Sequence, residues 1–362
     1  MKIGIIGLAN SGKTTVFNAL TGGSAETASF SSGQIEPNLA TVKVPDERIV
    51  RLSEMYKPKK TTFADVQYID VAGLSGGAAK SGGLAPAFLN YIAQVDALLH
   101  VVRAFEDLSV PHPNETLDPA RDISTVDLEM TFSDLAIIER RLQRLTAELK
   151  KMTGKERELR QQEHDILVRL QAGLEQDVPI RDQPLADDEE RLLRGYQFLT
   201  LKPTLIVLNI GEGALGQDLT TTITYLHQKS GIVQLAGQVE AEIAQLGSED
   251  AEVFLQDLGI AEPARERVIK RSYDLLGLIA FLTAGTDEVR AWPLRQGTPA
   301  VEAAGSIHSD LQRGFIRAEV IAFADLMAAG TMAEAKKRGT VRMEGKTYLV
   351  QDGDICNFLF NV

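Results

Sequence analysis

The residues with the clearest chemical potential lie near the N-terminus, where residues 7–14 read GLANSGKT. This matches G-x-x-x-x-G-K-[ST], and it stands between a short apolar run and a helical pattern, as that loop requires. Glycines there allow backbone N–H groups to surround phosphate oxygens, Lys13 can neutralise the terminal phosphates, and the Thr14 hydroxyl can ligate Mg²⁺. The motif and its position predict a loop that binds a nucleoside triphosphate.

A second phosphate motif follows in VQYIDVAG, residues 66–73. Asp70 ends an expected strand and can hold the Mg²⁺ shell, and the amide of Gly73 can approach a γ-phosphate. We therefore interpret Lys13, Asp70 and Gly73 as the catalytic candidates. Small GTPases commonly place a water-orienting Gln directly after that glycine, but Leu74 stands here and cannot hold a water. Hydrolysis is expected to be slow or differently organised.

The base-recognition signal departs from the guanine-binding pattern. Where guanine-binding proteins have Asn-Lys-x-Asp, this chain has Asn209-Ile210-Gly211-Glu212. The aspartate of that pattern accepts the N1–H and the exocyclic amine of guanine, so its replacement by Glu212 and the loss of the lysine put GTP specificity in question. The residues alone leave ATP or relaxed specificity open.

Several apolar segments must position these motifs. Strands are expected at 2–6, 66–70, 97–103 and 204–209, with a fifth at 232–235, and near-continuous apolar strands separated by helices predict a parallel sheet covered on both faces. Residues about 129–196 are expected to form an inserted helical hairpin. One apolar stripe at spacings of three and four indicates its first helix: Leu135, Ile138, Leu142, Leu145, Leu149 and Met152. The returning helix is expected to bury that stripe with Leu159, Ile166, Leu170 and Leu174.

The C-terminal part has a different pattern, with short strand-like pieces at 316–323, 341–343, 348–350 and 356–362 separated by turn residues. This favours a small β-rich domain from about residue 279.

Composition narrows the class of protein. Fifty Asp and Glu against 38 Lys and Arg in 362 residues give a formal charge of −12, which argues against indiscriminate coating of nucleic acid. No apolar run reaches membrane-spanning length, and a single cysteine, Cys356, cannot close an internal disulfide, so a cytoplasmic protein without a membrane partner is expected. Residues 140–160 nevertheless carry eight Lys or Arg against three Glu. This basic run indicates either a solvated helix face or a surface for phosphate-rich partners.

The motifs together resemble the Obg-like ATPase family, also called the YchF family, within the translation-factor-related P-loop class. The resemblance covers nearly the full length. It is carried by residues 7–14, 35–38, 44–48, 70–74, 100–107 and 209–212, and in the C-terminal part by residues 281–285, 290–292, 303–308, 314–320 and 350–354.

The resemblance implies a P-loop G-domain at 1–128 and 197–278, a coiled-coil insertion at 129–196, and a ubiquitin-like β-grasp TGS domain at 279–362. It implies ATP preferred over GTP, with Mg²⁺, and association with the ribosome or ribosomal RNA through the basic hairpin and the TGS domain. The residues that it assigns to phosphate are Asn10, Ser11, Gly12, Lys13, Thr14 and Thr15. Asn209, Ile210 and Glu212 would frame the base and Phe105 would wall its pocket. Asn10 also resembles the P-loop asparagine of K⁺-stimulated proteins, so K⁺ is a further hypothesis.

Two departures from the family pattern bear on activity. Family members usually have Thr before Ile-Glu-Pro-Asn, where this chain has Gln34, and a Gln carbonyl can join Thr14 and Asp70 around Mg²⁺ only with a longer reach. Ala9 and Ser11 replace the usual Pro and Val of the loop. The sequence thus predicts a diverged Mg²⁺-dependent nucleotidase. Two alternatives remain open: a nucleotide-responsive ribosome-binding scaffold of negligible turnover, and a GTPase with relaxed base specificity. It does not predict the oligomeric state.

Overall fold

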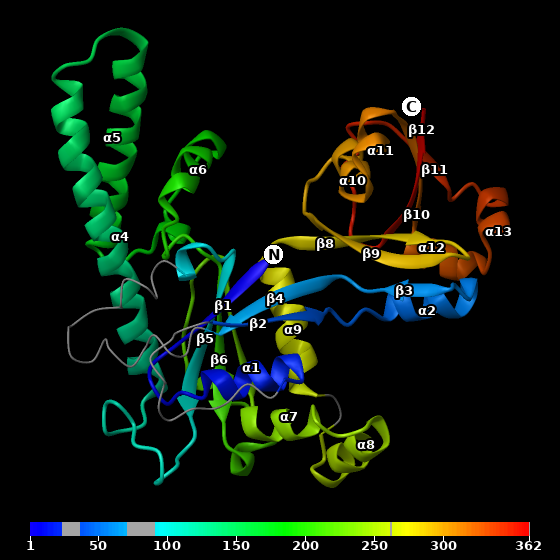
Figure 1. The fold of residues 1–362 in the computed structure, drawn as a ribbon, viewed down its shortest axis with the longest axis horizontal. Coiled ribbons are helices and arrows are strands. Elements are labelled where there is room, and N and C mark those ends of the chain that lie inside the picture. The colour runs from blue at the N-terminus through cyan, green and yellow to red at the C-terminus, as the bar shows by residue number, and fades with distance from the viewer. Residues whose placement is uncertain (24–36, 71–90, 261–262, 362) are drawn as a thin grey trace. The chain divides into compact units, whose positions relative to one another are not determined.

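The computed structural model describes residues 1–23, 37–70, 91–260 and 263–361 (Figure 1). Gln34, Gly73 and Leu74, which the sequence analysis singled out, lie outside the described residues. The chain divides into two compact units, one of residues 1–40 and 67–275 and the other of residues 41–66 and 276–362.

The first sheet has six strands in the order β2-β4-β1-β5-β6-β7. Neighbouring strands from β4 to β7 run parallel, and β6 is buried over its whole length, as its unbroken apolar sequence predicts. The bounds are β1 Lys2–Ile6, β2 Asn38–Lys43, β4 Asp65–Asp70, β5 Ala97–Ala104, β6 Thr204–Ile210 and β7 Ser230–Leu235. The five strands expected from the sequence are confirmed. We did not predict β2, since its residues are exposed or half-buried and show no apolar run.

Helices pack against this sheet and against one another (Figure 1). The helix that follows the phosphate motif, α1, packs on α7 and α9, and α9 also lies on β6 and β7. The bounds are α1 Lys13–Thr21, α4 Pro119–Leu149, α5 Gly154–Leu174, α6 Asp187–Leu193, α7 Gly237–Ile243, α8 Ser248–Asp257 and α9 Ala264–Leu275. Short 3₁₀ helices are η3 Ile180–Asp182, η4 Arg194–Tyr196, η5 Glu212–Ala214 and η6 Leu219–Thr222. No helix in the described part of the chain is both long enough and apolar enough to cross a membrane.

The predicted helical hairpin is formed by α4 and α5, which lie side by side in Figure 1. Its first helix begins at Pro119 rather than near residue 129, because Asp118 caps it by accepting a hydrogen bond from the amide of Arg121. Ile138, Leu145, Ile166, Leu170 and Leu174 share one buried core. Leu159 does not: its side chain is 64% exposed, so the expectation that it buries the stripe was wrong.

A buried carboxylate attaches this hairpin to the sheet domain. Asp134 of α4 accepts hydrogen bonds from the amides of Leu199 and Thr200 and from the hydroxyl of Thr200. Its burial raises its pKa to about 6. The chain leading into β6 is thereby fixed to the middle of α4.

The second unit contains a sheet in the order β11-β10-β12-β8-β9-β3. The strand bounds are β3 Lys60–Thr62, β8 Leu278–Ala284, β9 Glu288–Arg295, β10 Phe315–Ala322, β11 Arg342–Glu344 and β12 Asp354–Phe360. Its helices are α2 Glu47–Tyr56, α10 Ala300–Ile307, α11 Ser309–Arg313, α12 Phe323–Ala329 and α13 Met332–Lys337. Phe281, Phe315, Val320, Cys356 and Phe358 belong to its core. The β-rich character expected after residue 279 is thus observed, although residues 348–350 form only an isolated bridge instead of a strand.

Residues 41–66 belong to this second unit, whereas from the sequence we expected them with the phosphate motifs. The reason is a set of long-range contacts: β3 extends the sheet beside β9, and Arg48 of α2 binds the carboxylates of both Asp46 and Asp352. Arg48 and Asp352 are 304 positions apart in the chain. No local pattern indicates that pairing.

Candidate functional site

The phosphate motif forms a tight loop between β1 and α1. Gly7 has a φ of 143°, and a Cβ at that position would lie 2.2 Å from the carbonyl oxygen of Val101. Gly12 has a φ of 88°, and a Cβ there would lie 2.1 Å from Nδ2 of Asn209. Both positions therefore require glycine. The loop ends at the N-terminus of the nine-residue α1, where the unpaired amides and the helix dipole favour an anion.

Lys13 is held inside this loop. Its Nζ donates to the carbonyl oxygens of Leu8 at 2.7 Å and Gly7 at 3.2 Å, and the residue is only 6% exposed. Burial lowers the pKa of Lys13 to about 8, while the nearby Asp70 carboxylate acts in the opposite direction. Because the Lys13 ammonium group is removed from water, its charged form is stabilised when a polyanion occupies the loop.

The side chains of Thr14 and Asp70 meet at the same end of the sheet. The Thr14 hydroxyl donates to Oδ2 of Asp70 at 2.7 Å, and Asp70 is 1% exposed. A hydroxyl oxygen with free lone pairs beside a carboxylate is the kind of oxygen set that Mg²⁺ prefers, together with phosphate and water. The two residues therefore fit a magnesium ion at the position that the motifs predict. The third expected ligand, Gln34, lies outside the described residues.

Asn209, expected to frame the base, has both polar ends of its amide engaged by the backbone. Nδ2 donates to the carbonyl oxygen of Ser11 at 3.0 Å, and Oδ1 accepts from the amide of Gly237 at 3.0 Å. The residue is 4% exposed, and Gly237 has no room for a Cβ, which would lie 2.7 Å from Oδ1. Asn209 therefore fixes the phosphate loop to the start of α7. Its amide has a second N–H and a second lone pair, so its contact with a base stays a prediction.

The other expected base residues surround a small region at the end of β6. Phe105 is half-buried, and its side chain lies beside two glycines: an ideal Cβ on Gly12 would be 4.0 Å from its Cε1 and one on Gly211 would be 3.4 Å from its Cβ. Ile210 is buried at the end of β6, while Glu212 is exposed in η5. Phe105 and the turn at Gly211 are thus brought together with the phosphate loop.

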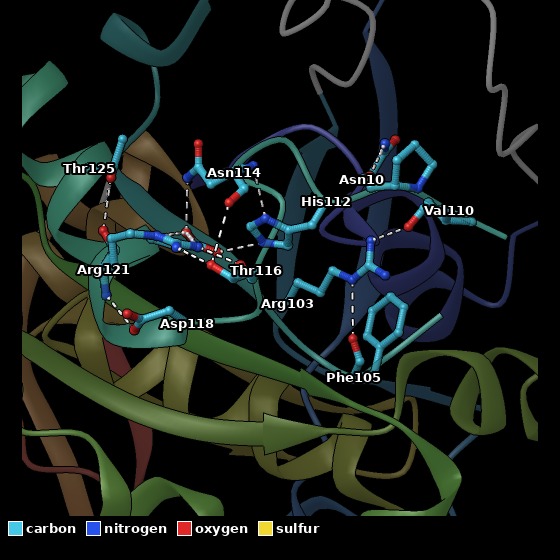
Figure 2. A network of polar contacts seen from close by, with 12 residues as sticks. Asn10, Arg103, Phe105, Val110, His112, Asn114, Thr116, Asp118, Arg121 and Thr125 are labelled. Carbon is cyan, nitrogen blue, oxygen red and sulfur yellow. Dashed lines mark hydrogen bonds and ion pairs between the residues drawn. The ribbon is translucent and has the colours of Figure 1, made fainter. Parts of the chain in front are cut away.

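The loop between β5 and α4, residues 105–118, is held by residues that sequence reasoning did not select (Figure 2). Arg103 donates to the backbone carbonyls of Phe105, Asp107 and Val110. His112 accepts from the backbone amide of Asn114 at Nδ1 and contacts Asp122 at 2.8 Å through Nε2. The sequence did offer one signal for Arg103: it lies in an expected buried strand, where an arginine is rare unless it has polar partners.

The phosphate loop contacts the same segment. Asn10, at a φ of 61°, donates from Nδ2 to the carbonyl oxygen of Pro111 at 3.0 Å. Ser11 and His112 line one small enclosed space beside the loop, together with His100. Burial lowers the pKa of His100 to about 3, so its ring is neutral. Thr15 is half-buried in the first turn of α1.

A larger concavity lies elsewhere, along α5 facing Glu189 of α6, with a volume of about 830 Å³. Its lining mixes both signs of charge, with Arg157 and Arg169 against Glu158 and Asp165. This arrangement favours no single class of ligand, whereas the phosphate loop combines a motif, a desolvated cation and a helix N-terminus.

Comparison with known proteins relates this geometry to described ones. A family model described as "50S ribosome-binding GTPase" matches residues 2–133, and a model named YchF-GTPase_C, described as a protein of unknown function, matches residues 278–361. The chain is 42% identical to "Ribosome-binding ATPase YchF" of Bacillus subtilis over 365 residues, covering 99% of both chains. It is 40% identical to the protein of the same name from Escherichia coli O157:H7, covering 100% of this chain and 99% of the relative.

A solved structure, the YchF GTPase of Schizosaccharomyces pombe, matches with a TM-score of 0.85 and 30% identity, covering 99% of this chain and 97% of that one. The expected P-loop fold is therefore confirmed, and the mixed α/β sheets of this chain match those of the solved structure. The matched description of the C-terminal part names no TGS domain, so that assignment stays a prediction.

Proposed function

The chain belongs to the YchF family, and from that premise we propose that it is a Mg²⁺-dependent P-loop nucleotidase that binds and slowly hydrolyses ATP in preference to GTP and associates with the ribosome. The observation that carries the proposal is the buried Lys13 ammonium at the N-terminus of α1, next to the Thr14–Asp70 pair. When a triphosphate occupies the loop, Lys13 can neutralise its phosphates, and Thr14 and Asp70 can hold the Mg²⁺ ion that accompanies it.

The proposed reaction is in-line attack of water on the γ-phosphate. Lys13 exchanges its two carbonyl partners for phosphate oxygens and stabilises charge that develops on them, in a site from which water is largely excluded. Thr14 and Asp70 would hold Mg²⁺, which supplies charge neutralisation on the phosphates. Asn209 keeps the loop in the binding conformation. The assignments of Gly73 as a γ-phosphate contact and of Gln34 as a metal ligand rest on the sequence alone.

The preference for ATP is supported by the Asn209 to Glu212 segment and by the names of the bacterial relatives, which are called ATPases. The printed name of the fission-yeast structure is instead a GTPase, as is that of the N-terminal family model. This keeps a GTPase as the second candidate. Glu212 is exposed, so its carboxylate is free to turn toward a base, and the binding comparison below separates the two candidates.

Ribosome association is proposed through the basic hairpin and the C-terminal domain, residues 279–362, which we assign to the TGS type. Of the eight basic residues at 140–160, Arg141 and Arg160 pair with Glu163 within the hairpin. In the described part of the chain the other six make no ion pair: Arg140, Arg144, Lys150, Lys151, Lys155 and Arg157. These six form the surface that we propose contacts rRNA phosphates.

The nucleotide proposal is tested by titrating nucleotide-free protein with non-hydrolysable ATP and GTP analogues in Mg²⁺, followed by a phosphate-release assay with the preferred nucleotide. We expect tighter binding of the ATP analogue, slow release, and loss of binding in Lys13→Ala but not in the exposed control Lys150→Ala. Unchanged affinity in Lys13→Ala contradicts the site. Binding without turnover supports the scaffold alternative, and tighter GTP binding supports a GTPase. Equal turnover in K⁺ and Na⁺ removes the K⁺ hypothesis that Asn10 suggested.

The ribosome proposal is tested by co-sedimentation of the variant Arg144→Glu/Lys151→Glu. We expect weaker and less salt-dependent binding, because two phosphate contacts are reversed. Arg267→Glu/Arg271→Glu, on the exposed face of α9, is the matched control and is expected to bind as the unmodified protein does. Equal binding of both variants at low salt contradicts the hairpin as the contact surface.

A further inference from the structure

Arg103 is a buried cation that the proposed chemistry does not use. It lies near the end of β5 and is 4% exposed, and in the described part of the chain it makes no ion pair. A buried guanidinium without a carboxylate partner is costly, so its position must be stabilised by other groups. Those groups are three backbone carbonyls and one aromatic ring.

The carbonyls all belong to the loop that begins with Phe105, and Figure 2 shows the bonds to Phe105 and Val110. Nε donates to the oxygen of Phe105 at 3.1 Å, Nη2 to that of Asp107 at 3.1 Å, and Nη1 to that of Val110 at 2.9 Å. The planar guanidinium has donors that diverge at fixed angles, so these three bonds determine the path of residues 105–110. Without Arg103, the carbonyls of Phe105 and Val110 lose this donor, and that of Asp107 keeps only the amide of Val110, at 3.3 Å.

The same guanidinium lies over the ring of Phe105, with its central carbon 4.7 Å from the ring centroid. Cation–π attraction and the bond to the Phe105 carbonyl thus fix both the backbone and the side chain of this residue. The fixed ring lies beside Gly12 of the phosphate loop and beside Gly211 of the turn after β6. Phe105 therefore lies where the phosphate region meets the turn that carries Glu212.

We propose that Arg103 is a positioning residue for base binding, which acts by holding Phe105 as a preformed wall between the phosphate loop and the Gly211 turn. The inference rests on the proposed nucleotide binding and deepens it. In this proposal the base is recognised by the Phe105 ring, which Arg103 holds in place. Binding of the triphosphate depends instead on Lys13 and the amides of the loop. Preorganisation of this kind strengthens binding of the purine, because the loop need not be ordered when the ligand arrives.

A comparison of two ligands separates this role from a general structural one. The first is a non-hydrolysable ATP analogue and the second is inorganic tripolyphosphate, which has the charge but no base. Both are titrated with Mg²⁺ into the full-length protein and its variants by calorimetry. Arg103→Met is expected to weaken the ATP analogue about tenfold while changing tripolyphosphate affinity less than about twofold.

Three further variants test the route of the effect. If Arg103 acts through Phe105, the double variant Arg103→Met/Phe105→Leu loses no more ATP affinity than Phe105→Leu alone. Arg103→Lys keeps a cation beside the ring but loses the diverging donors of the planar guanidinium. It is expected to show a smaller loss of affinity than Arg103→Met, again confined to the ATP analogue. Arg121→Met is the matched control, since Arg121 binds Thr116 in the second half of the same loop and is expected to leave both affinities unchanged.

The outcomes are distinct. An equal loss of both ligands in Arg103→Met and Arg103→Lys overturns the inference, because it places the damage in the phosphate loop. Additive losses in the double variant, an unchanged ATP affinity in Arg103→Met, or the same selective loss in Arg121→Met also overturn it. If the unmodified protein binds tripolyphosphate but no ATP analogue, the proposed nucleotide function fails instead. Circular dichroism melts of each variant verify that the protein compared is folded.

Discussion

Replacing Lys13 by Met is expected to stabilise the nucleotide-free protein while abolishing triphosphate binding. Burial lowers the pKa of Lys13 from 10.5 to about 8. Since one pKa unit corresponds to about 1.4 kcal/mol, keeping this lysine charged at pH 7 costs folding up to about 3 kcal/mol. The ammonium also donates to the carbonyls of Gly7 and Leu8, and losing those bonds offsets part of the gain. A net increase of about 1–2 kcal/mol in the free energy of unfolding is expected.

The sign of the pH dependence follows from the lowered pKa. The unfolded chain binds the Lys13 proton more tightly than the folded chain, so the cost is fully present below about pH 8 and disappears as the pH rises toward 10.5. The stability advantage of Lys13→Met should therefore be largest near neutral pH. It should be lost before pH 10.5, because the missing hydrogen bonds to Gly7 and Leu8 still destabilise the variant there. Addition of ATP and Mg²⁺ should reverse the order, because a ligand at about a hundred times its Kd stabilises only the protein that binds it, by about 2.7 kcal/mol.

The assay is urea unfolding followed by far-UV circular dichroism, together with hydrogen exchange of the α1 amides. Tryptophan fluorescence is unsuitable because Trp292, the one tryptophan in the sequence, belongs to the second unit. Lys150→Met, at the exposed turn of the hairpin, is the control and should change stability by less than about 0.5 kcal/mol. A nucleotide-free Lys13→Met protein that is less stable at pH 7, or a difference that does not depend on pH, would refute the reasoning.

Two further changes give sharp expectations. Gly12→Ala places a Cβ 2.1 Å from Nδ2 of Asn209 at a φ of 88°, so ATP affinity measured by calorimetry should fall at least about tenfold, whereas Gly213→Ala, with open space around it, should leave it unchanged. Glu163→Gln should reduce hairpin stability, measured by hydrogen exchange, by about 2 kcal/mol at pH 7. Burial acts to raise the pKa of Glu163, but hydrogen bonds from Arg141, Tyr196 and Arg160 outweigh it and lower the pKa to about 2. That stability is present above pH 4.5 and lost as the pH falls toward 2, so a cost that does not shrink in acid, or an equal cost in the exposed control Glu158→Gln, contradicts the assignment.

The strands and helices near the phosphate loop could be predicted because their signals are local. The apolar run at 204–210 forms β6, which is buried along its whole length. Ile138 and Leu145, two members of the stripe at spacings of three and four, are buried in the core on one side of α4. Gly7 and Gly12 could be placed for the same reason, since a loop that surrounds phosphate needs backbone conformations that only glycine adopts freely.

Residues whose partners are distant in the chain could not be assigned in this way. The amide of Asn209 joins Ser11 to Gly237, a role that the sequence did not predict, because only the fold brings these three segments together. The basic run at 140–160 gave a net charge, but a count of charges cannot show that Arg141 pairs with Glu163 on the facing helix. Local sequence reports propensity and periodicity, whereas these roles depend on which elements become neighbours.

The site therefore divides into two parts with different physical character. Near the expected position of the base, Asn209 and Arg103 are held by hydrogen bonds to backbone atoms, so this part is built before a ligand arrives. Near the expected position of the phosphates, burial disfavours the charged form of Lys13, and a bound anion would offset this cost. Triphosphate binding should accordingly supply most of the affinity, and a rigid wall at Phe105 should supply discrimination through shape more than through new hydrogen bonds. A carboxylate that can turn freely, such as Glu212, then modifies the choice between purines without controlling it alone.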